Sequence, residues 1–160
     1  MKKVLLIAVF AIFGLSSINA QEKGDFNAFG GATYDENFAL TAGVEYLITD
    51  DISIAPSFTY FFVDKPAGAT SASGTQLNID ARYYFGGTDE LNWYGLVGYG
   101  TRTAKVSGGG VSVSASVGGL NVGAGGLYSI SDSLNLIAQA KYFTGGDGAF
   151  VPTLGVQFGF

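Results

Sequence analysis

The chain lacks cysteine and histidine altogether, and only 13% of its 160 residues are charged. The absence of cysteine excludes a disulfide framework, a thiol nucleophile and a thiolate metal site. The absence of histidine removes the commonest general base and the commonest metal ligand of proteins. Acidic residues outnumber basic residues by 13 to 8, which argues against nucleic acid as a partner, because nucleic acid favours a basic surface. With 48% hydrophobic residues, the chain is too apolar to be disordered.

The first 20 residues have the pattern of a targeting segment. Lys2 and Lys3 precede an apolar run from Val4 to Leu15, which is shorter than the ~20 residues that a membrane-spanning helix needs. Small residues ending in Ala20 follow, as at a cleavage site. We therefore expect a cleavable signal peptide over residues 1–20 and an exported domain over residues 21–160, with an uncleaved anchor helix as the alternative.

Alternation of apolar and polar residues dominates the rest of the chain. In residues 75–85 every second residue from Leu77 is apolar, and the residues between them are mostly polar. Such a period of two is typical of strands whose two faces meet different surroundings. The pattern predicts eight strands, at residues 25–34, 38–48, 52–63, 75–85, 92–104, 117–130, 134–143 and 150–160.

The connectors between these segments differ at the two ends of the predicted strands. Short polar turns lie at residues 50–51, 86–90 and 131–133. The connectors at residues 35–37, 64–74, around 108–110 and at 144–149 are mostly longer. A meander with an even number of strands and this asymmetry is typical of outer-membrane barrels. The sequence therefore predicts an all-β fold, an eight-stranded antiparallel up-and-down transmembrane β-barrel preceded by a signal peptide.

The two faces of the strands suit a narrow barrel in lipid. The bulkier apolar face suits hydrocarbon, and the polar face, thinned by glycine, suits the lumen of an eight-stranded barrel, which side chains fill. Closure pairs every backbone group, as strands in lipid require. Aromatic residues near both strand ends predict two girdles at the headgroup level. They are Tyr46, Tyr83, Phe85, Trp93, Tyr128 and Phe158 at one end, and Tyr34, Phe38, Tyr60, Phe62, Tyr142 and Phe150 at the other.

Several charged residues fall on the polar face and are candidate lumen residues. They are Glu45, Asp80, Arg82 and Lys141, and Arg102 joins them if its segment, rich in glycine and aromatics, has the matching phase. Charges in a medium of low dielectric must be paired or hydrated. They form either a salt-bridge network that plugs the barrel or a gate whose pairs exchange partners and admit small ions.

Residues 105–117 form an unusual segment. After the glycines at 108–110, the apolar residues Val111, Val113, Ala115 and Val117 alternate with serines. This pattern predicts that the fifth and sixth strands continue beyond the membrane as a hairpin whose exposed edge binds an extracellular protein or surface. The alternative is an unstructured glycine and serine loop.

The last eight residues read TLGVQFGF, in which Thr153, Gly155, Phe158 and Phe160 fit the pattern polar-x-Gly-x-x-aromatic-x-aromatic. With the signal peptide and the eight strands, the chain resembles the small outer-membrane β-barrel proteins of Gram-negative bacteria, the OmpX, OmpA and OmpW-like group. The resemblance implies that the chain lies in the outer membrane with both mature ends in the periplasm. It also implies that the barrel assembly machinery reads the four C-terminal residues as an assembly signal.

The resemblance also bears on function. The enzymes among small barrels of this membrane rely on histidine, which this chain lacks, and basic residues are available to pair with any dyad of Glu45 and Asp80. The scattered carboxylates and the G-x-G fragments match no metal loop or phosphate loop, so we expect no cofactor. The leading interpretation is a non-enzymatic outer-membrane barrel with an envelope-structural, surface-interaction or adhesion role. The alternatives are a narrow channel for small solutes or ions and a soluble secreted barrel that binds an apolar ligand.

Overall fold

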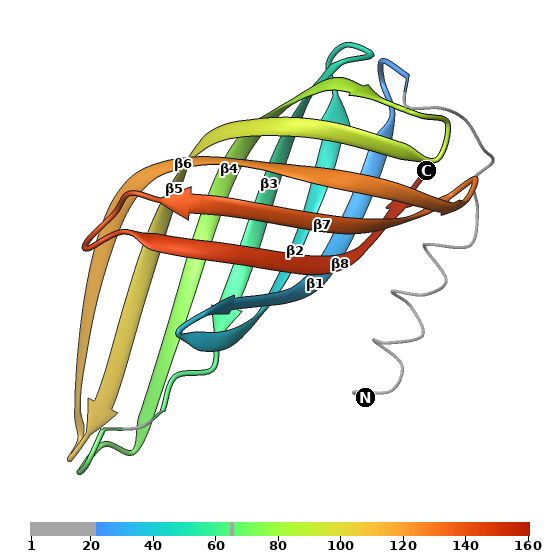
Figure 1. Cartoon of the computed structure of the whole chain (residues 1–160). Coiled ribbons are helices and arrows are strands. Elements are labelled where there is room, and N and C mark those ends of the chain that lie inside the picture. The colour runs from blue at the N-terminus through green and yellow to red at the C-terminus, as the bar shows by residue number, and fades with distance from the viewer. Residues whose placement is uncertain (1–21, 65) are drawn as a thin grey trace.

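The computed structural model describes residues 22–64 and 66–160, and the expected signal peptide lies outside them. Eight strands run antiparallel in chain order, and β1 closes the barrel against β8 (Figure 1). They are β1 Phe26–Asp35, β2 Asn37–Leu47, β3 Ile52–Phe61, β4 Ser71–Gly87, β5 Leu91–Gly108, β6 Val111–Ser131, β7 Leu134–Phe143 and β8 Ala149–Gly159. The predicted eight-stranded up-and-down barrel is thus confirmed. None of the described residues forms a helix long and apolar enough to cross a membrane.

The two faces of the strands are placed as the alternation predicts. On β4, Leu77 and Ile79 are each 63% exposed on the outside, whereas Asp80 and Arg82 are 3% and 2% exposed inside. The same division holds along β2 and β7, where Glu45 and Lys141 are buried between outward apolar neighbours. An outer surface this apolar is stable only against hydrocarbon, because water would oppose its exposure.

The structure settles the orientation of β1 and β5, which the sequence leaves open. Phe29 of β1 and both Tyr94 and Leu96 of β5 point inward and are buried. Trp93, next to Tyr94, points outward with 49% of its surface exposed. Aromatic residues on both faces of these strands hide the alternation, since hydrophobicity alone does not separate a lipid-facing ring from a lumen-facing one.

The predicted aromatic residues lie exposed at both ends of the barrel, except Phe158, which is half-buried. At one end the rings of Phe38 and Phe62 stack at 5.8 Å, and Tyr60 meets Phe62 edge-on at 5.2 Å. At the other end Phe26 lies 6.1 Å from Phe160. Amphipathic rings at these two levels form the girdles expected at the membrane interfaces.

Three strands are longer than their neighbours. Strands β4, β5 and β6 have 17, 18 and 21 residues, whereas each of the others has 10 or 11. Residues 71–74, expected in a connector, instead extend β4 and pair with β5 from Ser71 to Gly74. Serine, alanine and glycine have little intrinsic preference for strands, so these residues become a strand because they pair with β5. The asymmetry between the two ends of the barrel therefore comes mainly from strand length.

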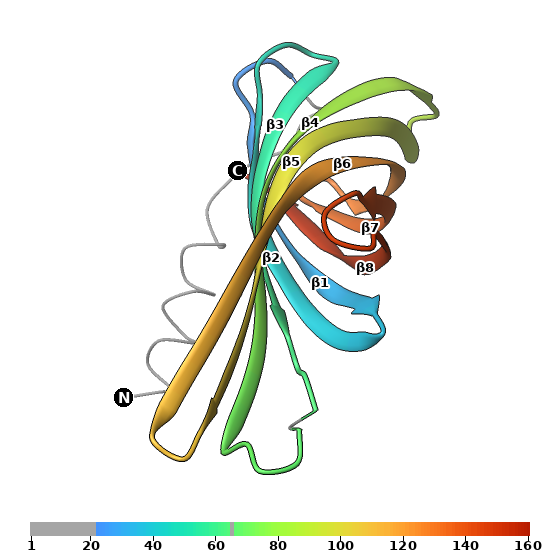
Figure 2. The same cartoon turned by 90° about the vertical axis from the view of Figure 1, so that its left-hand side faces the viewer.

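The extra length forms a sheet that projects from the barrel (Figure 2). We call residues 71–75 of β4, 103–108 of β5 and 111–117 of β6 the extension. Its strands stay paired to the tip, from Arg102 opposite Val117 to Gly108 opposite Val111. The predicted hairpin is therefore an ordered continuation of the barrel wall, and β4 adds a third strand to it.

Candidate functional site

Glu45 of β2 is the most completely satisfied charge in the lumen. Its Oε2 lies 3.2 Å from Arg82 Nη1, and its Oε1 accepts a 2.7 Å hydrogen bond from the Tyr84 hydroxyl. Ser53 and Gln157 also donate hydrogen bonds to the carboxylate. Four donors from β3, β4 and β8 thus converge on one carboxylate, which compensates its loss of hydration.

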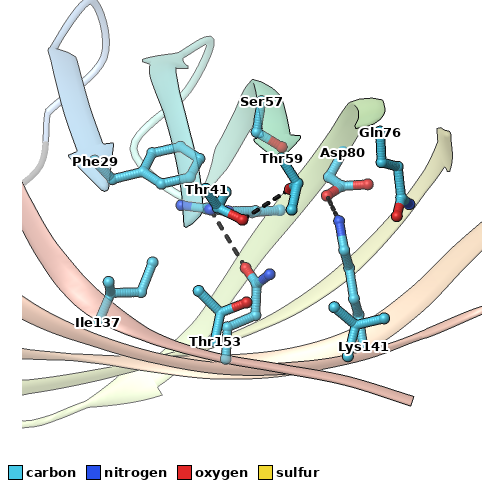
Figure 3. A pocket seen from close by; sticks show the side chains of 12 residues that line it. Phe29, Thr41, Ser57, Thr59, Gln76, Asp80, Ile137, Lys141 and Thr153 are labelled. Carbon is cyan, nitrogen blue, oxygen red and sulfur yellow. Dashed lines mark hydrogen bonds and ion pairs between the residues drawn. The ribbon is translucent and has the colours of Figure 1, made fainter. Parts of the chain in front are cut away.

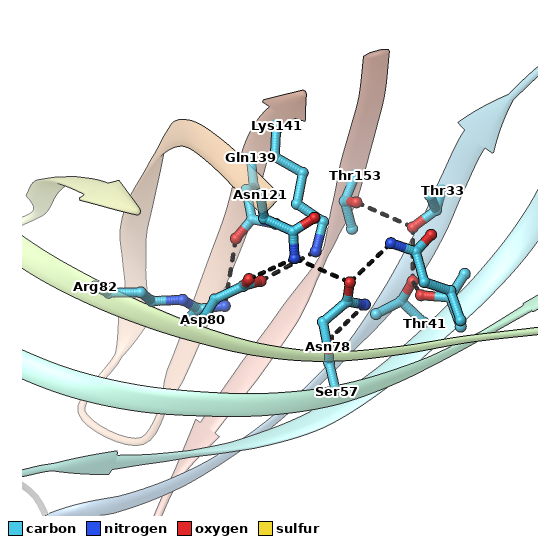
Figure 4. A network of polar contacts seen from close by, with 12 residues as sticks. Thr33, Thr41, Ser57, Asn78, Asp80, Arg82, Asn121, Gln139, Lys141 and Thr153 are labelled. Carbon is cyan, nitrogen blue, oxygen red and sulfur yellow. Dashed lines mark hydrogen bonds and ion pairs between the residues drawn. The ribbon is translucent and has the colours of Figure 1, made fainter. Parts of the chain in front are cut away.

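Asp80 of β4 is the second buried carboxylate. Its Oδ2 lies 3.0 Å from Lys141 Nζ of β7, and its Oδ1 accepts a 2.7 Å hydrogen bond from Asn121 Nδ2 of β6 (Figure 4). Asn121 Nδ2 also donates to Asn78 Oδ1 at 3.0 Å. The pair therefore belongs to a polar network that joins three strands across the lumen.

Arg82 also lies between two aromatic rings. Its guanidinium carbon is 4.7 Å from the centroid of Phe29 and 4.9 Å from that of Tyr94. These rings belong to β1 and β5, which are opposite each other in the barrel order. Because a desolvated cation is attracted to the face of an aromatic ring, this sandwich joins opposite walls of the barrel.

Arg102 forms a similar sandwich near the extension. Its guanidinium carbon lies 4.7 Å and 5.2 Å from the rings of Phe61 and Phe143, on β3 and β7. It contacts Asp35 at 2.5 Å and donates two hydrogen bonds to Gln76 Oε1, at 3.1 and 2.9 Å. The side chain is 24% exposed, so this ion pair is only partly shielded from water.

The sequence does not indicate Asp35 or the four aromatic partners of the arginines. Asp35 falls in a predicted connector, but it ends β1 with its carboxylate at Arg102. Alternation along the strand could have identified Phe61 and Phe143 as inward residues, because each is next to an outward ring, Tyr60 or Tyr142.

A belt of threonine hydroxyls lies in the same half of the lumen. Thr153, Thr33, Thr41 and Thr59 are linked in that order by hydrogen bonds of 3.0, 2.8 and 2.7 Å. They come from β8, β1, β2 and β3. The threonine hydroxyls satisfy one another's hydrogen-bonding capacity, so these inward side chains need no charged partner.

The lumen is not polar throughout, which corrects the expectation of a polar interior. Tyr84, Tyr94, Leu96, Leu127 and Ile137 form a buried apolar cluster. All five lie a few residues from the short turns that join β4 to β5 and β6 to β7. Apolar side chains fill this end at a lower desolvation cost than polar ones, since they need no hydrogen-bond partner.

The space left between these side chains is small. One cavity of about 10 Å³ is lined by Asp80, Arg82, Gln139 and Lys141 and by three residues of the threonine belt, Thr41, Thr59 and Thr153 (Figure 3). That volume has room for about one water molecule. Within the described residues, therefore, this cavity is too small for a hydrated ion.

The residues of the expected assembly signal lie on both faces of β8. Thr153 points inward and belongs to the threonine belt, whereas Phe158 lies on the outward phase next to buried Gln157. Gly155 packs against β1, where an added Cβ would collide with the backbone of Gly30. Their role in assembly stays a prediction.

The extension reverses the polarity of the barrel wall. On the face continuous with the lumen lie Val111, Val113, Ala115 and Val117, and the first two are 65% and 67% exposed. Across β5 they are paired with Gly108, Val106, Ala104 and Arg102. The face continuous with the lipid-facing surface carries hydroxyls instead, joined by hydrogen bonds of 2.8 Å between Thr103 and Ser116 and of 2.7 Å between Ser107 and Ser112. Such a surface suits water rather than hydrocarbon.

No group of three or more carboxylate, histidine or cysteine side chains that suits a metal ion occurs in the described ranges. The carboxylates Glu45, Asp80 and Asp35 are each engaged by a basic residue. The chemistry of the lumen is therefore that of ion pairs.

A closed barrel of eight strands with an apolar outer band, aromatic girdles and a filled polar lumen defines a small outer-membrane β-barrel. The chain belongs to the outer membrane protein beta-barrel domain family, whose model matches residues 13–160. Membership implies the outer membrane of a Gram-negative bacterium as its location. A search of curated proteins found no significant match.

Solved structures share the fold. The N-terminal β-barrel domain of Pseudomonas aeruginosa OprF is 20% identical, with a TM-score of 0.75 over 88% of this chain and 100% of that one. The attachment invasion locus protein Ail of Yersinia pestis is 20% identical, with a TM-score of 0.63 over 86% and 99%. Neisserial surface protein A is 19% identical, with a TM-score of 0.65 over 85% and 95%.

Proposed function

We propose that the protein is a non-enzymatic outer-membrane anchor that presents the extension at the cell surface for contact with another protein or surface. The observation that carries this proposal is the reversal of polarity along β5 and β6. Outward side chains are apolar as far as Tyr99 and Leu120, and beyond them they are hydroxyl-bearing except for Gly118 and the charged Lys105. The lipid boundary therefore lies near these two residues, with the extension beyond it in water.

The size of the extension supports a role in contact. Residues 111–117 alone add roughly 20 Å of strand at ~3.3 Å per residue. The short turns lie at the opposite end of the barrel. The periplasmic location of the termini, implied by the family resemblance, puts these turns in the periplasm and the extension outside the cell.

The lumen supports the role of a rigid anchor. Two ion pairs join β2 to β4 and β4 to β7 across the lumen, and two arginine sandwiches connect strands that lie on opposite walls. Each buried carboxylate is held by a cation and by neutral donors, which leaves neither of them free to act as a general base. This arrangement favours a filled, inert barrel over an enzyme.

The partner is not expected to be a polyanion. Ail has been crystallised with the heparin analogue sucrose octasulfate. In this chain the described charges near the extension are mostly acidic, namely Glu36, Asp64 and Asp147, against an unpaired Lys105. Arg102 is neutralised by Asp35. Sulfated ligands would be repelled here, so an uncharged protein surface is the better partner.

Deletion of residues 106–116 tests the proposal. Cells that express the shortened chain should lose binding to the surface or protein that the full chain binds, because the apolar face and the edge of β6 are removed. Fractionation to the outer membrane and a gel migration that shifts on boiling should stay unchanged. Unchanged binding would refute the proposal, and a protein extracted without detergent would favour the soluble barrel.

A narrow channel is the second candidate, because the cavity adjoins Asp80, Arg82 and Lys141. If these charges exchanged partners, the cavity would widen into a path for small ions. Planar-bilayer recordings of the native chain and of Glu45→Ala and Arg82→Ala separate the two functions. Conductance that changes with either substitution supports the channel. Absence of conductance in the native chain and in both variants supports the filled anchor.

A further inference from the structure

The two side edges of the extension differ. The β4 edge is short, because β3 pairs with β4 as far as Phe61 opposite Gly74 and only Ser71, Ala72 and Ser73 lie beyond that pair. On the other side, β7 pairs with β6 only from Asn121 onward. Leu120 is the last residue capped, by two 2.8 Å bonds with Thr144. Within the described chain, residues 111–117 of β6 therefore have a paired neighbour on the β5 side only.

This open edge has none of the features that protect strand edges from pairing. From Val106 to Ser131 the chain contains no charged residue and no proline. The strand is regular, since the pairing of β5 with β6 shows no bulge. Charges, prolines and bulges are the usual means of preventing edge-to-edge association. Their absence at an exposed edge indicates that pairing is tolerated or used.

The sequence of the edge is complementary to itself. Residues 111–117 read VSVSASV, which is nearly the same in both directions. In an antiparallel pair of two copies centred on Ser114, Val111 faces Val117 of the other copy and Val113 faces Ala115. All apolar side chains then fall on one face and all serines on the other, so the two sheets continue each other.

Membrane geometry decides where the second copy must be. Copies in one membrane share one orientation, so a two-fold axis that relates two of them runs along the membrane normal. For strands tilted by ~40° this axis makes the two edges cross at roughly 80°, which precludes antiparallel pairing. An antiparallel pair needs a two-fold axis perpendicular to the strand. Two copies in apposed membranes, facing each other, satisfy that condition.

We propose that residues 111–117 of β6 pair with the same residues of a second copy in an apposed outer membrane, so that the protein joins cells by binding itself. This inference rests on the proposed role of the extension in surface contact and names its partner. Many copies on each surface would act together, so a weak single pair is sufficient.

Vesicle clustering tests the inference. The mature chain reconstituted in phosphatidylcholine vesicles is expected to raise their mean diameter in dynamic light scattering several-fold. Val113→Lys should abolish the increase, because it places a charge in the middle of the paired face. Ser73→Lys adds the same charge to β4, which β5 separates from the β6 edge, and should leave clustering intact. Both variants should keep the heat-dependent gel shift, since both side chains are on the extension.

Cross-linking tests the register and the location of the partner. The chain has no cysteine, so Ser114→Cys introduces a single thiol. Oxidation of two mixed vesicle populations, one carrying a tagged copy, should give a dimer of tagged and untagged chains, and Ser73→Cys should not. Dimers confined to one population, absence of clustering by the native chain, or clustering by Val113→Lys would each overturn the inference.

The two proposals fail differently. If vesicles do not cluster but deletion of residues 106–116 still abolishes binding of cells to another surface, self-recognition is wrong and surface contact stands. If the deletion changes neither clustering nor binding, both are wrong.

Discussion

Substitution of Glu45 by alanine should be the most damaging single change in the lumen. The carboxylate is fully buried, with Arg82 at 3.2 Å and three neutral donors around it. Alanine removes the counter-charge of Arg82 and the acceptor of Tyr84, Ser53 and Gln157 in one step. Arg82 itself is 2% exposed, so it cannot turn to solvent without opening the barrel.

The magnitude follows from the uncompensated cation. Removal of one member of a buried ion pair costs about 3–5 kcal/mol, and a single unsatisfied buried donor costs about 1–3 kcal/mol. These contributions are not additive, because the space of the lost carboxylate admits water that serves several donors. We therefore expect Glu45→Ala to lower the free energy of unfolding by about 4 kcal/mol. Glu45→Gln retains an acceptor oxygen and should lose less.

Urea unfolding in lipid vesicles measures this loss. The chain has one tryptophan, Trp93, which lies 49% exposed on the outer face. Its emission reports the transfer of the girdle from lipid to water. The double variant Glu45→Ala/Arg82→Ala completes a cycle, and its coupling energy should be about 1–3 kcal/mol.

Two outcomes would refute the reasoning. A loss below about 1 kcal/mol in Glu45→Ala would mean that Arg82 is stabilised without its counter-charge, through its rings or through water. Strict additivity of the two single substitutions would mean that the ion pair contributes no coupling. In either case the lumen would be more hydrated than its packing indicates.

Three further predictions concern other parts of the barrel. Arg102→Lys keeps the charge but loses the planar contact with two rings, so urea unfolding should show a loss of about 1 kcal/mol, smaller than at Glu45 because the site is partly hydrated; a loss as large as that of Glu45→Ala would contradict this. Ile79→Lys, on the lipid-facing side, should lower the free energy of unfolding by about 2–4 kcal/mol, whereas Ser107→Lys on the extension should change it little. Equal effects of the two substitutions would mean that the lipid boundary is misplaced. Gly43→Val should prevent assembly, seen as loss of the heat-dependent gel shift, because a Cβ there collides with the ring of Phe29 and with the backbone of the next strand.

The number of strands and, outside β1 and β5, the identity of the lipid-facing residues are determined by the sequence alone. Hydrocarbon imposes one requirement on every strand, which is that each second side chain be apolar, and this requirement is local. Leu77 and Ile79 are therefore readable as outward, and Asp80 and Arg82 as inward, without knowledge of the neighbouring strands.

The partners inside the lumen were decided only by the tertiary structure. Glu45 pairs with Arg82 and Asp80 with Lys141 because closure of the barrel and its stagger set which inward residues share a level. No local pattern encodes that level. The rings that enclose Arg82 come from opposite strands, and Asp35 reaches Arg102 only because β1 ends beside it.

The extension shows the same division on a larger scale. The alternation of valine and serine predicts a strand at residues 111–117, whether the valines continue the lumen wall or the lipid-facing surface. Its apolar face continues the lumen wall rather than the lipid face because the pairing with β5 runs without a bulge from the barrel to the tip. The open edge exists because β7 ends at Phe143, opposite Asn121, and therefore does not reach residues 111–117 of β6. The length of a strand depends on its neighbours, which the local sequence does not specify.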